Sequence, residues 1–221
     1  MSATIELHGD VAVITMDDGK ANAINPTMLG ALNAALDQAE KQAKAVVIVG
    51  REQRFSAGFD LKMMQGAAPQ EVTDLVKGGG RLALRLYDFP MPVVAACTGH
   101  GIAMGCFILL ACDVRIGALG PYKIGANETA INMVLPAFGF ELAKARLNPR
   151  FLTDSVIHST LYDPEQAIVA GYLDSVAAPD KVLEVAIARA QELSVLTSKA
   201  YAMNKHLLRR HSLDAIAPTV M

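Results

Sequence analysis

The sequence predicts an α/β fold, with a sheet covered by helices and followed by an all-helical C-terminal region. Short runs rich in β-branched residues alternate along the chain with segments of helical periodicity, as in α/β proteins. Residues 45–49 and 92–97 are continuously apolar, which is typical of strands buried on both faces. The 221 residues are 52 % hydrophobic and include 17 Gly and 10 Pro, a composition that excludes disorder and fibrous repeats.

The N-terminal segment begins with a predicted hairpin. Residues 4–8 and 11–16 are β-rich runs separated by a Gly-Asp turn signal. Asn25 followed by Pro26 predicts the N-cap and the first residue of a helix, which extends towards residue 44 with apolar side chains at helical spacing. The first strand that is buried on both faces follows this helix.

Helices and strands continue to alternate through the middle of the chain. Residues 70–88 predict a helix, which the three consecutive glycines at 78–80 are expected to interrupt. After the second buried strand, residues 104–112 predict a buried helix and residues 114–117 a short strand.

The C-terminal part of the chain is mainly helical. Residues 179–192 and 198–209 predict two strongly amphipathic helices. We therefore expect a core at residues 1–178 that carries the site, and a helical region at residues 179–221. The basic run at residues 209–211 is expected to lie on a solvated helix face.

Charge and cysteine content exclude several classes of protein. A formal charge of −2 argues against a nucleic-acid partner, because neutralising phosphates requires a basic surplus. The most apolar stretch, residues 101–112, is far shorter than the ~20 residues that span a bilayer, and the first residues lack a signal-peptide pattern. Cys97, Cys106 and Cys112 are expected to be reduced core residues of a cytoplasmic protein. They have no His or Cys partners at metal-ligand spacing, so no metal site is predicted.

Two glycine-bearing turns are the candidate functional elements. Residues 54–62 follow one buried strand and open a short helix, and residues 98–105 connect another strand to the buried helix. Small residues in such turns let the backbone approach a ligand, and the free N–H groups at a helix start point towards negative charge. Two such turns facing each other have the geometry of an oxyanion hole for a thioester enolate.

The sequence resembles the crotonase (enoyl-CoA hydratase/isomerase) superfamily over nearly its whole length. The segments that carry this resemblance are residues 20–25, 55–62, 92–113, 163–167 and 171–174. The resemblance implies a spiral of ββα units with a C-terminal helical trimerisation region, and a homotrimer or a dimer of trimers. It also implies an acyl-CoA thioester as the binding partner, with no separate cofactor, since coenzyme A is part of the substrate.

The resemblance also implies roles for individual residues. The backbone N–H groups of Ala57 and Met104 are expected to form the oxyanion hole, and Glu128 to act as the catalytic acid–base. The family usually has Gly where Met104 stands, so the Met side chain is expected to narrow the acyl pocket. The Lys62 side chain is expected to reach a CoA phosphate, and Asp60 to cap or position the turn. The residues expected to contact substrate are Ala21, Ala23, Ser56, Gly58, Asp60, Leu61, Lys62, Gly105 and Phe107.

One position separates two reactions. Phe107 resembles the place where a two-glutamate hydratase has one of its catalytic acids, whereas Glu128 is retained. Hydration needs a water held between an acid and a base, while a shift of a double bond needs one base only. We therefore expect an isomerase that converts a 3-enoyl-CoA into a 2-enoyl-CoA.

Three other functions remain open from the sequence. One Glu can still support slow hydration, and a family member without turnover would remain a CoA-thioester-binding protein. The glycines of residues 98–105 and a Tyr-x3-Lys spacing at Tyr201 and Lys205 also mimic a nicotinamide-dependent dehydrogenase. In a dinucleotide-binding unit, however, the glycine turn lies near the N-terminus and the acidic residue about 20 positions further on, so Asp113 comes too early. His100 is expected to be structural. The chain ends at Met221, which is early for this family, so we expect a short final helix or a more open CoA site.

Overall fold

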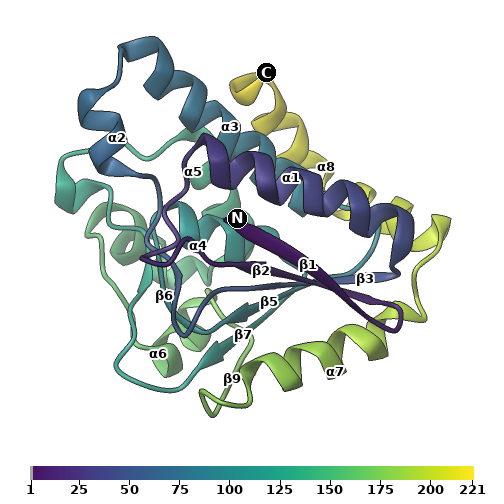
Figure 1. The fold of residues 1–221 in the computed structure, drawn as a ribbon. Helices are drawn as coiled ribbons and strands as arrows, with labels where there is room; N and C mark the ends of the chain where they lie inside the picture. The colour runs from purple at the N-terminus through teal and green to yellow at the C-terminus, as the bar shows by residue number, and fades with distance from the viewer. Residues whose placement is uncertain (1) are drawn as a thin grey trace.

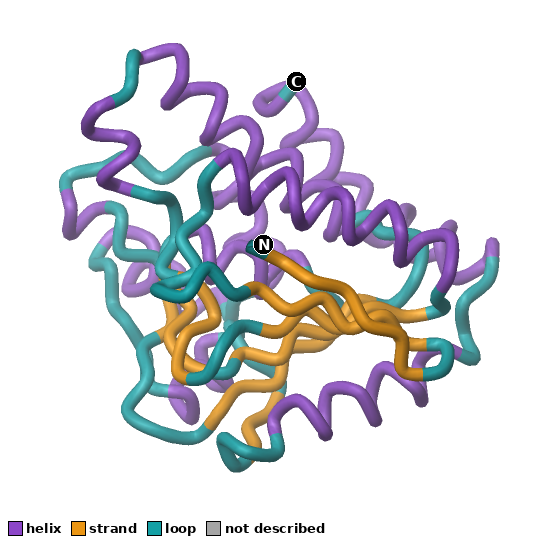
Figure 2. Tube along the Cα trace, viewed as in Figure 1, coloured by secondary structure: helices purple, strands orange, loops and turns teal. Residues whose placement is uncertain are grey.

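The computed structural model describes residues 2–221, which form a large and a small β-sheet with helices on both sides of the large one. The large sheet has the strand order β1-β2-β3-β5-β7-β9 (Figures 1 and 2). Its first two strands are antiparallel and every later pair is parallel. Its strands are β1 (Ala3–His8), β2 (Val11–Met16), β3 (Ala45–Val49), β5 (Val93–Cys97), β7 (Val114–Ala118) and β9 (Ser175–Ala177).

The small sheet is built from the strands that follow β3, β5 and β7 in the chain. These strands are β4 (Gln53–Ser56), β6 (Gly99–Ile102) and β8 (Ile124–Gly125). They are parallel and lie in that order. Each repeat therefore adds one strand to the large sheet, one to the small sheet and then a helical segment. The predicted spiral of ββα units is confirmed.

Helices cover both faces of the large sheet. Figure 1 shows α1, α3 and α8 on one side and α7 on the other. The α-helices are α1 (Pro26–Gln42), α2 (Leu61–Gly66), α3 (Pro69–Tyr87), α4 (Met104–Ala111), α5 (Ala137–Arg146), α6 (Pro164–Ala170), α7 (Val182–Ser194) and α8 (Lys199–Val220). Shorter helical turns lie at Thr129–Ile131, Pro149–Phe151 and Thr153–Ile157.

The continuous apolar run in β3 follows from these two layers. Val46 and Ile48 pack into the core that contains α1, α3 and α4. Ala45, Val47 and Val49 point the other way, into a second core formed with α7. Because both faces of this strand are buried, neither set of alternating positions can be polar.

The helix α3 corrects one prediction. It runs unbroken through the three glycines, where an interruption was expected. A Cβ at Gly78 would lie 2.9 Å from Leu29 of α1, and one at Gly80 would lie 2.4 Å from Val220 of α8. The glycines therefore allow neighbouring side chains to approach the helix axis closely, and the resulting packing offsets their low helix propensity.

The helix α8 corrects two more predictions. Lys205 and Arg209 point inward, where both pair with the carboxylate of Asp113, while Leu207 and Leu208 are exposed. The segment is therefore not amphipathic in the expected sense, and Arg209 does not belong to a solvated face. The helix is 22 residues long, so of the two alternatives expected for the C-terminus the short final helix is wrong, and a more open CoA site stays a prediction. Both C-terminal helices pack on the core, α7 against the large sheet and α8 against α3 and α5.

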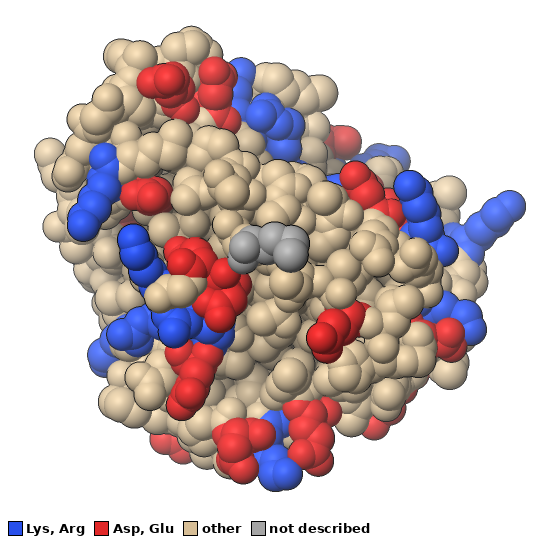
Figure 3. Space-filling view, viewed as in Figure 1, with Lys and Arg blue, Asp and Glu red and all other residues tan. Residues whose placement is uncertain are grey.

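On the face drawn in Figure 3, basic and acidic side chains are interspersed. Within residues 2–221, no helix combines the length and the apolar composition that crossing a bilayer would require. In the same residues, no cluster of three or more His, Cys, Asp or Glu side chains is placed to hold a metal ion.

Candidate active site

The first glycine turn is fixed by buried hydrogen bonds to the segment at residues 20–25. The Ser56 hydroxyl donates to the Asn22 carbonyl at 2.7 Å and accepts from the Gly58 N–H at 3.2 Å. The Asn22 side-chain amide donates to the Phe55 carbonyl at 3.1 Å. Gly58 has φ +89°, a conformation that glycine adopts without the steric cost of a Cβ. The turn is therefore rigid before any ligand binds.

Hydrogen bonding in this turn identifies a different donor from the expected one. The Ala57 N–H donates to the Ala21 carbonyl at 3.0 Å and is therefore occupied. The Ile24 N–H donates to the Gly58 carbonyl, and the Ile24 carbonyl accepts from the Asp60 N–H. Because both of these groups face Ile24, the Phe59 N–H between them points away from Ile24. Within residues 2–221 the Phe59 N–H donates to no acceptor. The available amide of this turn is that of Phe59, and the assignment to Ala57 is corrected.

The second turn presents the Met104 N–H at the first residue of α4. Met104 follows Ala103, whose φ of +52° and ψ of −124° are strained for a residue with a Cβ. Among the described residues, the Met104 N–H has no acceptor either. A Cβ at Gly58 would lie 3.1 Å from the Met104 nitrogen, so the two turns are in close contact. Gly105 also allows the two turns to approach each other, because a Cβ at this position would lie 2.5 Å from the Ser56 carbonyl oxygen.

A cavity of about 90 Å³ opens beside these two amides. Its walls come from the first turn and α2, from α3, from the start of α4 and from the segment at residues 127–136. Only Asn127 and Glu128 contribute polar side chains. The lining residues are Ala57, Phe59, Leu61, Val76, Ala103, Asn127, Glu128, Ile131, Met133, Val134 and Pro136.

Glu128 is the one carboxylate among the described lining residues. It is 6 % exposed, and its Oε2 has no hydrogen-bond partner within residues 2–221. Burial raises the pKa of Glu128 from 4.5 to about 7, against the lowering effect of backbone hydrogen bonds. Asn127 next to it also has an unpartnered buried Oδ1 in the described chain. A carboxyl group that titrates near neutrality, faces an apolar cavity and is not paired is suited to accept and return a proton.

The structure places Phe107 away from the cavity. Its ring is 1 % exposed and packs edge-on against Phe138 with centroids 5.7 Å apart. A Cβ at Gly139 would lie 2.9 Å from the same ring. Phe107 therefore fills the core behind the site, and it does not line the cavity as a substrate contact would.

The other predicted substrate contacts occupy different environments. Leu61 lines the cavity, and Lys62 beside it is exposed on the first turn of α2. Asp60 caps α2 by accepting the Met63 N–H at 3.1 Å. Ala21 and Ala23 are half-buried in the segment that runs along the first turn.

Several cavity residues had no signal in the sequence. Val76 comes from α3, Ile131 from the end of the short helical turn at Thr129–Ile131, and Met133 and Val134 from the irregular segment that follows it. Their side chains are ordinary apolar residues in separate parts of the chain. Only the folded backbone shows that they share one cavity.

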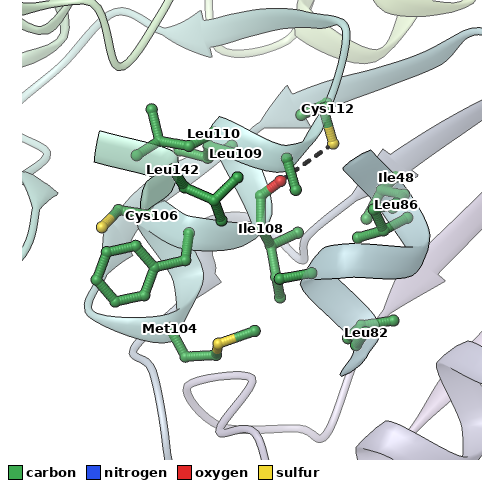
Figure 4. Close-up of a cluster of buried hydrophobic side chains, with 14 of the residues drawn as sticks. Ile48, Leu82, Leu86, Met104, Cys106, Ile108, Leu109, Leu110, Cys112 and Leu142 are labelled. Carbon is green, nitrogen blue, oxygen red and sulfur yellow. Dashed lines mark hydrogen bonds between the residues drawn. The ribbon is translucent and has the colours of Figure 1, made fainter. Parts of the chain in front are cut away.

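The remaining candidate side chains do not join the site. The His100 Nδ1 accepts the Lys123 N–H at 3.1 Å, in a structural contact. Burial raises the pKa of the Cys97 and Cys112 thiols to about 12, so neither is a thiolate nucleophile. Figure 4 shows Cys112 among core side chains. Its thiol donates a hydrogen bond to the Ile108 carbonyl at 3.2 Å.

Comparison with known proteins agrees with this arrangement. The family model for enoyl-CoA hydratase/isomerase matches residues 6–219. The chain is similar to a Mycobacterium tuberculosis enoyl-CoA isomerase, with 40 % identity, coverage of 99 % of this chain and 96 % of that chain, and a TM-score of 0.95. It is similar to a Mycobacterium marinum enoyl-CoA hydratase, with 38 % identity, coverage of 100 % and 96 %, and a TM-score of 0.94. The human mitochondrial Δ3-Δ2-enoyl-CoA isomerase is 27 % identical, with coverage of 100 % and 91 % and a TM-score of 0.91.

These relatives include proteins named for both reactions of the family. They share the fold over nearly the full length of this chain, and the family match includes both glycine turns and Glu128. The chain therefore belongs to the enoyl-CoA hydratase/isomerase family of acyl-CoA enzymes.

Proposed function

We propose that the protein is an isomerase that converts a 3-enoyl-CoA into a 2-enoyl-CoA. The observation that carries this proposal is that Glu128 is the only carboxylate among the described residues that line the cavity. A second acid does not stand at the expected place, because Phe107 occupies that position in the core.

Glu128 moves one proton in this reaction. Its carboxylate removes a proton from C2 of the acyl chain, and the electrons of that C–H bond form a C1–C2 double bond while the carbonyl π electrons move onto the thioester oxygen. The resulting dienolate keeps the C3–C4 double bond and carries negative charge on the thioester oxygen. Protonated Glu128 then gives the same proton to C4 as the carbonyl re-forms, the C1–C2 π electrons become the C2–C3 double bond, and the C3–C4 π electrons form the new C4–H bond. A carboxyl pKa of about 7 suits both steps, because the group loses and gains a proton near neutral pH.

The two free amides stabilise the dienolate. The N–H groups of Phe59 and Met104 have no acceptor in the described chain and adjoin the cavity. Donors that are already oriented stabilise charge as it develops, without reorganisation at the moment of reaction. The hydrogen bonds of Ser56 and the backbone of Ala103 hold these two amides in place.

The CoA portion is proposed to leave the cavity along α2. Lys62 is exposed beside the cavity residue Leu61, where its ammonium group can pair with a phosphate. Ala21 and Ala23 lie on the segment next to the first turn, where small side chains leave the backbone accessible.

A homotrimer or a dimer of trimers is proposed as the assembly. The outer side of α8 and the segment before it carry exposed apolar residues, and a further copy of the chain would bury them. These residues are Val195, Leu196, Met203, Leu207 and Leu208. Light scattering of the purified protein tests this proposal, and a monomer at micromolar concentration would contradict it.

The central experiment compares two substrates in two proteins. The wild type is assayed with 3-hexenoyl-CoA for isomerisation and with crotonyl-CoA for hydration, and Glu128→Gln is assayed in the same way. We expect isomerisation by the wild type and a loss of about 10³-fold or more in kcat for Glu128→Gln, because no other lining residue that the structure describes carries an acid or base. Glu165→Gln, on the exposed side of α6, is the matched control. Intact isomerisation by Glu128→Gln, or hydration faster than isomerisation in the wild type, would overturn the proposal.

A further inference from the structure

Gly79 of α3 lies against the side chains of both residues that supply the free amides. A Cβ at this position would lie 2.5 Å from Cζ of the Phe59 ring and 3.2 Å from Sδ of Met104. The tip of the Phe59 ring and the Met104 thioether therefore pack directly against the helix backbone at Gly79. Val76, one turn earlier on the same face of α3, lines the cavity.

Phe59 forms part of the cavity wall next to α3, and its ring packs on that helix at Gly79. Phe59 is a lining residue and reaches Gly79, so no open space remains between the ring and the helix. Met104 is fully buried behind it, at the start of α4 in Figure 4. The cavity beside this ring has a volume of about 90 Å³ and is partly open to the surface.

We propose that Phe59, held against Gly79 and backed by Met104, sets the depth of the acyl cavity and restricts the protein to short acyl chains. This inference rests on the proposed function, because it assigns the cavity to the acyl chain. It adds a substrate class, short-chain acyl-CoA thioesters, and a specificity determinant on α3 that does not touch substrate itself.

Binding of saturated acyl-CoA thioesters tests the proposal without turnover. Calorimetry gives the Kd of butyryl-, hexanoyl-, octanoyl- and decanoyl-CoA for the wild type. Each buried CH₂ improves affinity by about fourfold, so two carbons give about tenfold or more. We expect this gain from butyryl- to hexanoyl-CoA, and less than about threefold from hexanoyl- to decanoyl-CoA, because further carbons find no apolar space.

Two variants change the depth in opposite directions. In Phe59→Ala the gain in affinity is expected to continue to decanoyl-CoA, by about tenfold or more beyond hexanoyl-CoA. In Gly79→Ala the new methyl group pushes the ring into the cavity, and the affinity for hexanoyl-CoA is expected to fall about tenfold while that for butyryl-CoA changes little.

Gly78→Ala is the matched control on the same helix. Within residues 2–221, its methyl group would lie 2.9 Å from Leu29 Cδ1 and 3.8 Å from an Arg81 side-chain nitrogen. Neither residue lines the cavity. This variant makes the same change in helix propensity as Gly79→Ala, so a loss common to both would be structural. We expect Gly78→Ala to keep the wild-type order of affinities.

The outcomes separate this inference from the proposed function. Affinity of the wild type that rises by the same increment up to decanoyl-CoA would overturn the depth limit, even if 3-hexenoyl-CoA is isomerised. Unchanged chain-length dependence in both Phe59→Ala and Gly79→Ala would also overturn it. Conversely, the expected binding series in a wild type that does not isomerise 3-hexenoyl-CoA would support the depth limit and overturn the proposed reaction.

Discussion

Asp113 and Glu128 carry carboxylates that are both largely buried, and the regions around them are organised in opposite ways. The Asp113 side chain is 12 % exposed and accepts hydrogen bonds from the Val93 N–H at 2.7 Å, the Lys205 ammonium at 2.7 Å and the Tyr201 hydroxyl at 3.3 Å. The Arg209 guanidinium adds an ion pair at 2.8 Å. At Glu128, by contrast, Oε2 has no partner within residues 2–221.

This difference contrasts a carboxylate that is fully paired with one that is proposed to react. Burying a polar group costs free energy unless it is hydrogen-bonded, and burying a charge costs more unless it is also paired. Asp113 meets both conditions, and its partners attach α8 to the core. Glu128 has no ion-pair partner and no hydrogen bond at its Oε2 within residues 2–221, and burial raises its pKa. In the proposed reaction, the unpaired group is the one that exchanges a proton with the substrate.

Breaking the Asp113 cluster is expected to give the largest change in stability. Lys205 and Arg209 are only 7 % and 8 % exposed. Asp113→Ala therefore leaves their two charges buried without the carboxylate that pairs with them. Removing one partner of a buried pair typically costs 3–5 kcal/mol, and we expect a loss of about 4 kcal/mol in the free energy of unfolding. Denaturant unfolding at neutral pH measures it.

Removing all the charges together provides the control. A triple variant with Asp113→Leu, Lys205→Met and Arg209→Met exchanges the cluster for apolar groups, and we expect it to recover most of the lost stability. A loss below about 1 kcal/mol in Asp113→Ala would contradict the comparison, because the cluster would then contribute no more than an exposed pair.

The pH dependence of stability is the second test, and it concerns Glu128. Its pKa in the folded protein, about 7, lies above the ordinary value of 4.5, so between these pH values the folded state binds more protons than the unfolded state. Stability from this group is therefore present at low pH and is lost as pH rises towards 7. Relative to Glu128→Gln, the wild type is expected to lose roughly 3 kcal/mol between pH 4 and pH 8.

The measurement is a pair of unfolding curves at each pH. Glu128→Gln carries no titrating group at this position, so the difference between the two proteins isolates Glu128. Glu165→Gln, at an exposed position, is expected to follow the wild type throughout. A difference between wild type and Glu128→Gln that does not change with pH would show that Glu128 is solvated or paired in solution.

The sequence predicted the parts of the fold that local patterns determine. The runs in β3 and β5 were predicted because burial on both faces leaves no polar positions, and the Asn25 cap because its side chain bonds the nearby Met28 N–H at 2.9 Å. The polarity of α8 was not predicted. The partner of Lys205 and Arg209 is Asp113, distant in the chain, and only that pairing makes inward charges acceptable.

For the candidate site, too, the sequence identified local features but not the pairing between distant segments. Both glycine turns, Met104 and Glu128 were identified as candidates, and all adjoin or line the cavity in the structure. The donor in the first turn was assigned to the wrong residue, since the Ala57 N–H is bound by the Ala21 carbonyl and the Phe59 N–H is not. Which amide is free depends on how a separate segment pairs with the turn, and residue types do not encode that pairing locally.

The smallest expected effect concerns Ala103, next to the reactive region. Its φ of +52° and ψ of −124° strain a residue with a Cβ, and such strain typically costs 1–3 kcal/mol. Ala103→Gly removes this strain but adds flexibility to the unfolded chain, so we expect a net gain of about 1 kcal/mol in the free energy of unfolding.

Asn132→Gly is the matched control for Ala103→Gly. Asn132 has φ +58° and ψ 38°, a left-handed conformation that asparagine tolerates, so its replacement is expected to change stability by only a few tenths of a kcal/mol. Denaturant midpoints of both variants decide the point. A destabilised Ala103→Gly would show that the turn is relaxed, and the contrast with the fully paired Asp113 region would then rest on Glu128 alone. A gain at Ala103 and none at Asn132 would mean that the rest of the fold holds the turn before Met104 in a less stable arrangement, beside the cavity that Ala103 lines.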